Sequence, residues 1–548
     1  MADRSQPVKS VGTRAPSSAT PRAAASTIAP WQKPNYGLTA LALLAVAVIV
    51  LLTLGTLAAV AMRADTPVTL RVSDWAAIRF TLWQAALSAA LSVALAIPVA
   101  RGLARRRFPG RGLLITALGA PFLLPVIVAA MGLIAIFGRN GVVNAGLGAL
   151  GLPEVAIYGP QGVILAHVFL NLPLATRLVL QGWLSIPAER FRLAESLGCN
   201  SRDIMRLLEW PMLRAVVPGA AVVIFAVCLT SFAVVLALGG GPRATTVELA
   251  IYQAFRFDFD LGRAALLGLI QFALTATAAA LAFGLVRPVM FGGGLDRVVS
   301  RRDADHWALR VQDSLAILSA AVFLLLPMAV IAVDGAPGLF SLPPQVWAAL
   351  GRSLWVALLS TAMCLALAVP LALFAAKWRH GRAIEALGTL TIAASPLVIG
   401  TGLFVVIFPY MRPSDLALPI TALVNAALSL PFGLRALAPA ARDVQADYGR
   451  LAESLGLRGF ARLRLLTWPR LRRPIGFAAG LAAALSMGDL GVIALFADPD
   501  SATLPLQMYR LMAAYRNDDS AAAALLLLLA SFGLFWIFDR GGRADAGT

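Results

Sequence analysis

Long apolar runs separated by short polar segments dominate this chain of 548 residues. The runs are continuous rather than alternating, which favours helices over strands. Each is close to the roughly 20 residues that a helix needs to cross a bilayer, where backbone groups must be satisfied internally. The pattern predicts twelve spans near 37–62, 80–100, 113–137, 160–182, 217–238, 262–286, 313–335, 352–374, 385–408, 416–440, 473–495 and 520–538.

The polar segments complete the predicted organisation. The N-terminal stretch is rich in Ser, Pro, Ala and Arg and has no periodicity, which is typical of disorder. The first apolar run exceeds a signal-peptide core of about 7–15 residues, so it is predicted to stay as the first span. The predicted divisions are 1–35 (disordered tail), 36–286 (first transmembrane half), 287–312 (linker), 313–540 (second transmembrane half) and 541–548 (tail).

Composition and charge agree with a membrane protein. Hydrophobic residues make up 59% of the chain and charged residues 14%, whereas a soluble domain carries about 25% charged residues. Most of the basic residues behind the net charge of +18 fall on one side of the twelve spans, and the opposite loops, such as 138–159 and 496–519, are poorer in them. The positive-inside rule places the basic side, and with it both termini, in the cytoplasm. The charge therefore indicates orientation in an all-α polytopic membrane protein and not a nucleic-acid partner.

One charged segment occurs twice. Leu-Ala-Glu-Ser-Leu-Gly stands at 193–198 and 451–456, and Trp-Pro at 210–211 and 468–469, both at an offset of 258. Leu-Trp at 82–83 returns at 354–355, at an offset of 272. The halves are therefore predicted to be parallel six-helix repeats, with about fourteen extra residues in the first half, placed in its 138–159 loop.

Each copy of the repeated loop is predicted to form a helical hairpin. A short helix from Ala188 to Leu197 would end at Gly198 in a left-handed conformation. Asn200 or Ser201 would cap a second short helix that ends near Pro211, and the second copy is expected to repeat this arrangement. Such an apolar knob with basic flanks suits a groove on a partner protein. The alternative is a helix pair lying on lipid headgroups.

The sequence carries no pattern of an enzyme active site. It has no phosphate-binding glycine loop followed by lysine, and no Gly-x-Ser-x-Gly elbow. Its three histidines and three cysteines are not at metal-ligand spacing. We therefore expect no catalytic residue, no metal site and no cofactor bound by this chain.

A few polar residues are candidates for a membrane pathway. Asp489 lies in the eleventh predicted span, where an ionisable group is a functional hypothesis by default; the alternatives are a structural carboxylate in a broken helix and a residue at the outer end. Thr230 and Ser231 occupy the equivalent place in the first half and either line the same cavity or pack helices. Three further candidates are expected on external loops or short gating helices, with a solvated loop face as the alternative: Glu248, Tyr252 and Tyr509.

The repeated loop resembles the conserved cytoplasmic loop of ABC importer permeases, whose pattern is Glu-Ala-Ala, three residues, Gly, and a later hydrophobic-x-Leu-Pro. The positions that match this pattern are Ala194, Gly198, Pro211, Ala452, Gly456 and Pro469. Arg192 and Arg450 stand where the family has Glu, and Glu195 and Glu453 are candidates to take over its contact. The resemblance implies a type I importer fold, with each loop seated in one of two ATPase subunits that hold ATP and Mg²⁺.

A closer resemblance is to the thiamine-transport permeases, which fuse two such halves in one chain. It rests on the stretches 106–111, 165–173, 238–253 and 486–489 and extends over nearly all of 74–538. It implies a permease of the bacterial inner membrane that takes up thiamine or its phosphates from a periplasmic binding protein. Ferric-iron permeases share the two-half layout and are the main alternative. A twelve-span secondary transporter would need coupling acids and bases in several spans, and a channel is weaker still.

Overall fold

The computed structural model describes residues 36–63, 70–119, 124–285, 306–378 and 394–543, together with isolated positions between 381 and 391. These residues form helices and no strand. The predicted tail 1–35, most of the linker 287–312 and Pro121 of the third predicted span lie outside the described residues. The linker's last residues already belong to a helix that starts at Trp307.

The first half follows the predicted order of spans. Its elements are α1 (Tyr36–Val50), a π-helical turn (Leu51–Gly55), α2 (Thr56–Arg63), α3 (Val72–Arg105), α4 (Arg111–Ala117), α5 (Val126–Phe137), α6 (Val142–Ala149), α7 (Pro160–Leu184), α8 (Ala188–Ser196), α9 (Ser201–Ile204), a π-helical turn (Met205–Glu209), α10 (Trp210–Leu229), α11 (Ala233–Leu238), a 3₁₀ turn (Pro242–Ala244), α12 (Val247–Arg256) and α13 (Leu261–Leu285).

The second half repeats most of this order. Its elements are α14 (Trp307–Gly335), α15 (Pro344–Lys377), α17 (Pro396–Ile407), a 3₁₀ turn (Pro413–Leu416), α18 (Ala417–Ser454), α19 (Gly459–Arg462), a π-helical turn (Leu463–Thr467), α20 (Trp468–Met487), α21 (Gly491–Phe496), a 3₁₀ turn (Pro499–Ser501), α22 (Leu504–Ala513) and α23 (Asn517–Arg543).

Eleven helical segments of the described residues are long and apolar enough to cross a bilayer. The remaining predicted span, 385–408, appears as α17, which has only 12 residues and begins at Pro396. Its counterpart α5 also has 12 residues and follows Pro125. Proline lacks a backbone N–H and suits the start of a helix, so both halves shorten their third helix at a proline. The all-α polytopic membrane fold is confirmed.

The first helices of the two halves are exchanged. α1 packs on α15, and α2 packs on α17, so the first span covers the second half. In return, α14 packs on α3 and α5 of the first half. Glycines allow both close approaches: a Cβ at Gly402 would lie 2.6 Å from Thr56, and a Cβ at Gly132 would lie 2.9 Å from Ile331.

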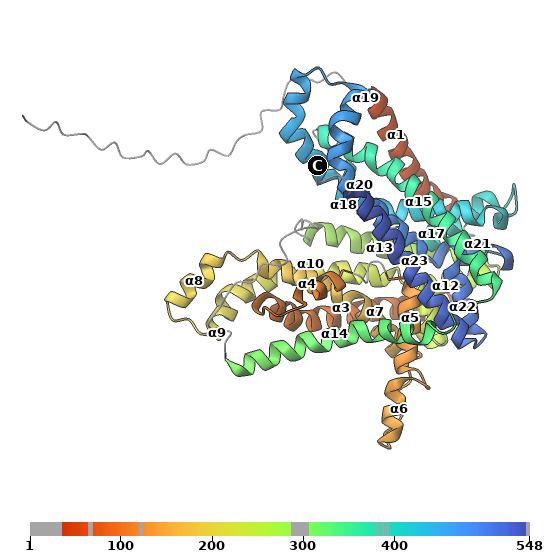
Figure 1. The fold of residues 1–548 in the computed structure, drawn as a ribbon. Helices are drawn as coiled ribbons and strands as arrows, with labels where there is room; N and C mark the ends of the chain where they lie inside the picture. The colour runs from red at the N-terminus through yellow and green to blue at the C-terminus, as the bar shows by residue number, and fades with distance from the viewer. Residues whose placement is uncertain are drawn as a thin grey trace, which may run out of the picture.

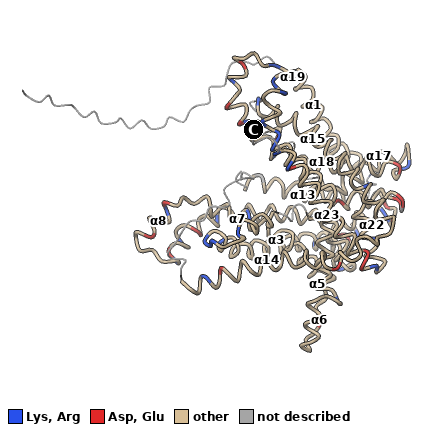
Figure 2. Tube along the Cα trace, in the orientation of Figure 1, with Lys and Arg blue, Asp and Glu red and all other residues tan. Residues whose placement is uncertain are grey.

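The helices diverge as two arms. Figure 1 shows α3, α7, α10 and α14 running toward α8 and α9, whereas α15, α18 and α20 run toward α19. The arms meet at the opposite end, near α12, α17, α21 and α22. Figure 2 shows charged residues gathered toward the ends of the helices and few along their middle. This distribution is what a bilayer requires, because a charge in its interior is expensive.

Candidate functional site

The first copy of the repeated loop, 188–211, forms the hairpin that its sequence predicts. α8 ends at Gly198, whose φ of +69° is left-handed, and the N–H of Cys199 donates to the carbonyl of Ala194 at 3.0 Å. The Asn200 side chain then caps α9 by accepting from the N–H groups of Arg202 and Asp203. Glycine and asparagine thus close one helix and open the next.

The second copy, 446–469, differs from its prediction. Gly456 has φ +63°, and the N–H of Leu457 donates to Ala452 at 2.9 Å, so the glycine cap is the same. The expected separate short helix is wrong, because α18 continues through the membrane into this loop as one helix of 38 residues. In the first half, α7 stops at Leu184 and Pro187 precedes α8.

The predicted helix end near Pro211 is also wrong. The hairpin passes through a π-helical turn directly into α10, in which Pro211 occupies the first turn. The N–H of Trp210 donates five residues back, to Met205, and Trp468 does the same to Leu463. The π-helical turn lets a new helix, α10, begin just before the proline. Pro211 then lies in the first turn of α10, where proline is tolerated, and so it does not end the helix. Each loop is thereby joined rigidly to a membrane helix.

Both loops expose large apolar side chains. The first loop surface consists of Leu193, Leu197, Leu207 and Trp210, and the second loop surface consists of Leu451, Leu455, Leu465 and Trp468. These side chains are 47% to 72% exposed, and each has its counterpart at the same offset of 258. A largely apolar pocket of about 360 Å³ opens between Leu193, Leu197 and Leu207. Exposed apolar patches of this kind mark interaction sites.

Arginine flanks both surfaces where the resemblance leads one to expect glutamate. Arg192 is 73% exposed, and its nearest carboxylate oxygen, on Glu189, is 3.9 Å away. A surface pair of this kind contributes little free energy. Arg450, Glu195 and Glu453 are exposed as well. These charged groups are therefore presented at the edge of the loop surfaces.

The pathway candidates Thr230, Ser231 and Asp489 lie where two membrane helices break. α10 stops before α11 at 230–232, and α20 stops before α21 at 488–490, so Asp489 is the counterpart of Ser231. One carboxylate oxygen of Asp489 accepts from the N–H of Gly491 at 3.3 Å. The other oxygen is buried, and the Asn425 side chain and the N–H groups of Val492 and Ile493 also act on the carboxylate. Asp489 thus caps the start of α21.

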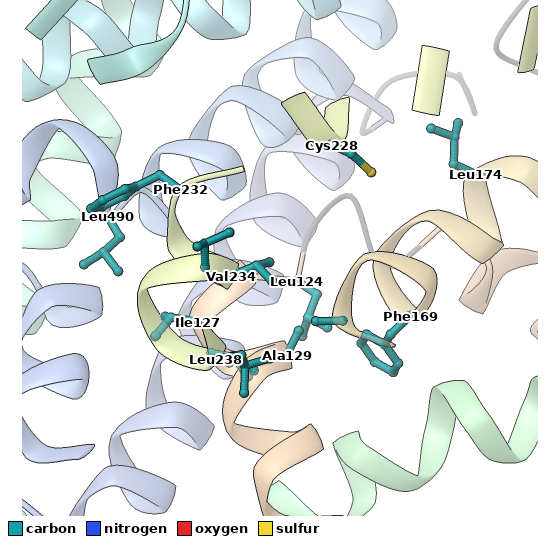
Figure 3. Packing of buried hydrophobic residues seen from close by; sticks show 14 of the residues in the cluster. Leu124, Ile127, Ala129, Phe169, Leu174, Cys228, Phe232, Val234, Leu238 and Leu490 are labelled. Carbon is teal, nitrogen blue, oxygen red and sulfur yellow. The ribbon is translucent and has the colours of Figure 1, made fainter. Parts of the chain in front are cut away.

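The two breaks and the two proline-started helices meet in one place. A Cβ at Gly491 would lie 3.4 Å from Pro396 and 3.9 Å from Phe232, and one at Gly488 would lie 3.1 Å from Pro125. Figure 3 shows Phe232 beside Leu490 within the apolar core. Segments from both halves therefore enclose this region.

The candidates on α12 and α22 lie next to the breaks. The ring of Tyr252 is 5.2 Å from that of Phe232, and Tyr509 is close enough to interact electrostatically with Tyr252. Glu248 is fully buried, so a solvated loop face is wrong for this residue. α12 is not among the candidate spans. Burial raises the pKa of Glu248 to about 7, against the opposing effect of Ser395 and Gln271.

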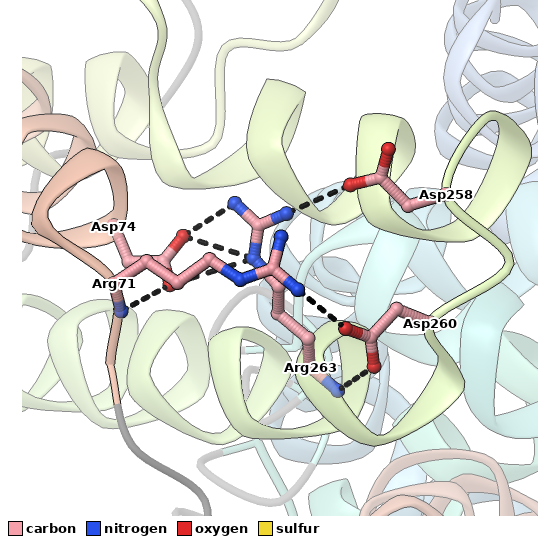
Figure 4. A network of polar contacts seen from close by, with 5 residues as sticks. All are labelled: Arg71, Asp74, Asp258, Asp260 and Arg263. Atoms are coloured by element: carbon pink, nitrogen blue, oxygen red, sulfur yellow. Dashed lines mark hydrogen bonds and ion pairs between the residues drawn. The ribbon is translucent and has the colours of Figure 1, made fainter.

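A network of ion pairs fixes the loop after α12. It was not predicted from the sequence. Arg263 on α13 pairs with Asp74 of α3 at 2.6 Å and with Asp258 at 2.8 Å, and Arg71 pairs with Asp260 at 3.1 Å (Figure 4). Three acids and two arginines thus join the start of α3 to the start of α13. The close spacing of Asp258, Asp260 and Arg263 was the only local signal, because Asp74 is distant in sequence.

A second network, also missed, lies at the first loop. Glu209 pairs with Arg101 at 2.8 Å and with Arg105 at 3.4 Å, and Asp313 pairs with Arg106 at 2.8 Å. Glu209 is 0% exposed and Asp313 2%. The network joins the π-helical turn after α9 to α3 and to α14, elements that no local sequence pattern connects.

The chain is similar along nearly its whole length to curated permeases. The thiamine transport system permease protein ThiP of Brucella abortus (strain 2308) is 40% identical over 537 residues, which cover 95% of this chain and 98% of the relative. ThiP of Escherichia coli (strain K12) is 38% identical over 478 residues, covering 85% and 89%. The sulfate transport system permease protein CysW of Synechococcus elongatus is 27% identical over 187 residues, covering 33% and 63%. No family model matches the chain.

Proposed function

The chain belongs to the family of thiamine transport permeases, and from this premise we propose that its two loop surfaces seat two ATPase subunits that drive the uptake of thiamine. A permease of this family is a multi-pass membrane subunit of a transport system and not an enzyme. The observation that carries the proposal is the duplication of the exposed side chains themselves. Two identical partner subunits need two equal surfaces, and lipid contact sets no such requirement.

The connection between loop and membrane supplies the mechanism. Each loop surface continues through its π-helical turn into α10 or α20 without a break. Those helices end at the breaks beside Thr230 and Asp489. Closure of an ATPase pair, with ATP and Mg²⁺ bound on those subunits, would move the loops together. The helices then carry this movement to the region where the two halves meet.

The helix breaks form the proposed pathway. Thiamine is a cation, and the carboxylate of Asp489 lies at the break, where its negative charge would attract that cation. Ser231 is its counterpart in the first half, and Tyr252 and Tyr509 stand beside the breaks. A periplasmic binding protein would deliver thiamine or its phosphates at this end. The loops and both termini would then face the cytoplasm of a bacterial cell, with the spans in its inner membrane.

Purification of the complex tests the docking role. The tagged permease is co-expressed with its ATPase subunit, and the double variant Leu193→Asp, Leu451→Asp places a charge on both loop surfaces. We expect the unaltered chain to retain two ATPase copies and the variant to lose at least nine tenths of them. Leu152→Asp, at an exposed leucine away from the loops, is the matched control. Full retention of the ATPase by the double variant would contradict the proposal.

A further inference from the structure

Both loop surfaces continue into α10 or α20, but on their N-terminal side the two halves connect them to the membrane by different means. In the second half, α18 runs without interruption from the membrane to Ser454, so a movement of the second loop surface is carried along one helix. In the first half, α7 ends at Leu184 and α8 begins at Ala188. Pro187 lies between them, where the second half has Gln445 at the offset of 258. Proline disfavours helix in the residue before it, so this connection is broken.

The charged network at Glu209 exists only where the helix is broken. Glu209 lies one residue before α10 and binds Arg101 and Arg105 of α3. At the offset of 258 the second half has Thr467 in place of Glu209, and at the offset of 272 it has Leu373 in place of Arg101. The Thr467 hydroxyl bonds within its own loop, to the carbonyl of Arg462 at 3.3 Å. Lys377 stands at the position of Arg105 and interacts electrostatically with Glu453 of the second loop, but both are exposed. The described part of the second half therefore has no buried equivalent of the Glu209–Arg101 ion pair.

We propose that, beside the route along α10 and α20, movement of the ATPase reaches the membrane along α18 in the second half and through the Glu209 ion pairs in the first. In this reading Glu209 is a positioning residue for energy coupling, and it substitutes for the helix that Pro187 interrupts. The inference rests on the proposed function, because it assigns a mechanical route to each ATPase seat.

The burial of the network makes it a stiff connection. Glu209 has no exposed surface, and the side chain of Arg105 is 1% exposed. Opposite charges attract strongly where water is excluded, and separating them would leave an uncompensated buried charge. Arg105 also lies 3.9 Å from Asp313 on α14, the helix that the second half contributes to the first. A displacement of Glu209 is thus passed to α3 and α14 together.

Glu209→Gln tests this route in the assembled transporter. The full chain is purified with its ATPase and binding protein and reconstituted in liposomes, and thiamine uptake and ATP hydrolysis are measured on the same sample. We expect the variant to keep its ATPase copies and its hydrolysis and to transport at least tenfold less thiamine per ATP. Thr467→Val, the matched change in the second half, should leave this ratio unchanged.

Two further variants separate coupling from mere stability. Pro187→Gln introduces the residue of the uninterrupted helix, and combined with Glu209→Gln it should restore most of the lost ratio. Gln445→Pro, which breaks α18 in the half that lacks a buried pair like Glu209–Arg101, should lower the ratio by itself. If Glu209→Gln does not assemble, Arg101→Leu with Glu209→Thr removes both charges together and gives the first half the residues of the second.

The outcomes separate this inference from the function on which it rests. An unchanged ratio of thiamine to ATP in an assembled Glu209→Gln or Arg101→Leu, Glu209→Thr complex overturns the inference alone. A fall in thiamine transported per ATP that Pro187→Gln does not restore also overturns the inference. The ion pair would then not substitute for a helix. Failure of the unaltered chain to bind ATPase would overturn the proposed function as well.

Discussion

The glycine that ends each loop helix offers a sharp test of how the loop surfaces are formed. Gly198 and Gly456 have φ values of +69° and +63°, and a Cβ at either position would meet nothing within 4 Å. A side chain there therefore fits the space, and its cost is backbone strain alone. For an L-residue this strain is about 1 to 2 kcal/mol, and we expect the upper value for a β-branched residue, which fits φ above zero poorly.

The free loop can relieve that strain by leaving the capped conformation, so binding of the ATPase must restore this conformation at the same cost. Since about 1.4 kcal/mol is a factor of ten, Gly198→Val should weaken binding of the ATPase to the solubilised permease by about 5- to 30-fold. Gly456→Val should do the same on the other side. Asparagine visits the left-handed region far more readily, so Gly198→Asn and Gly456→Asn are the matched controls and should bind almost normally.

The assay is a titration of the permease with labelled ATPase, accompanied by thermal unfolding of each variant. Binding by the valine variants within twofold of the unaltered chain would refute the reasoning, because the left-handed cap would then not determine the surface. Equal weakening of ATPase binding by the valine and asparagine variants would also refute the role of backbone strain. That result would mean that the docked partner fills the space at the glycine, so that any side chain is excluded.

Three further substitutions test the region where the halves meet. Glu248→Gln should leave the free energy of unfolding unchanged at pH 4.5 and raise it by about 3 kcal/mol at pH 8. The pKa of Glu248 is about 7 in the folded chain against an ordinary 4.5, so the stability of the unaltered chain falls as pH rises between those values. Equal unfolding temperatures of the variant and the unaltered chain at pH 8 would contradict this. Arg263→Met should cost about 3 kcal/mol by leaving Asp74 buried without its arginine, as seen in thermal unfolding, and a loss below 1 kcal/mol would count against the network. Asp489→Asn should retain the cap of α21 but lose thiamine uptake, whereas Asp489→Ala should lose uptake and about 1 kcal/mol of stability; normal uptake by Asp489→Asn would exclude the carboxylate from the pathway.

The sequence predicted what local patterns determine. Apolar runs determine spans because a bilayer sets their length, and Gly198 ends a helix because its conformation is a local property. The sequence could not predict the Glu209–Arg101 pair, since the two residues are 108 positions apart and meet only when α3 packs against α10. A broken helix at Asp489 was only one of the alternatives, because apolar residues continue on both sides of it, and the gap between α20 and α21 agrees with that alternative.

The repeat itself misled in one respect. Identical strings at 193–198 and 451–456 suggested identical hairpins, yet the first hairpin is separate and the second is the end of α18. The difference lies just before the repeated strings, where the first half has Pro187 and the second half has Gln445 at the corresponding position. Pro187 coincides with the gap between α7 and α8, because proline disfavours helix in the residue before it, although α18 accommodates Pro431 and Pro439 in its interior. The cap that follows depends only on the glycine.

The two halves are alike in their loop surfaces and differ at their helix breaks, and we relate this to what each region would bind. The proposed seating of two copies of one ATPase requires equal surfaces, and the four side chains that define each loop surface correspond. A single thiamine molecule has no twofold symmetry, so the pathway need not match, and there Asp489 takes the place that Ser231 has in the other half. A chain that fuses the halves can hold such a difference, which a homodimer of one half could not. Exchange of the two side chains, Ser231→Asp with Asp489→Ser, should therefore abolish uptake while leaving ATPase binding intact; retained uptake would show that the site does not distinguish the halves.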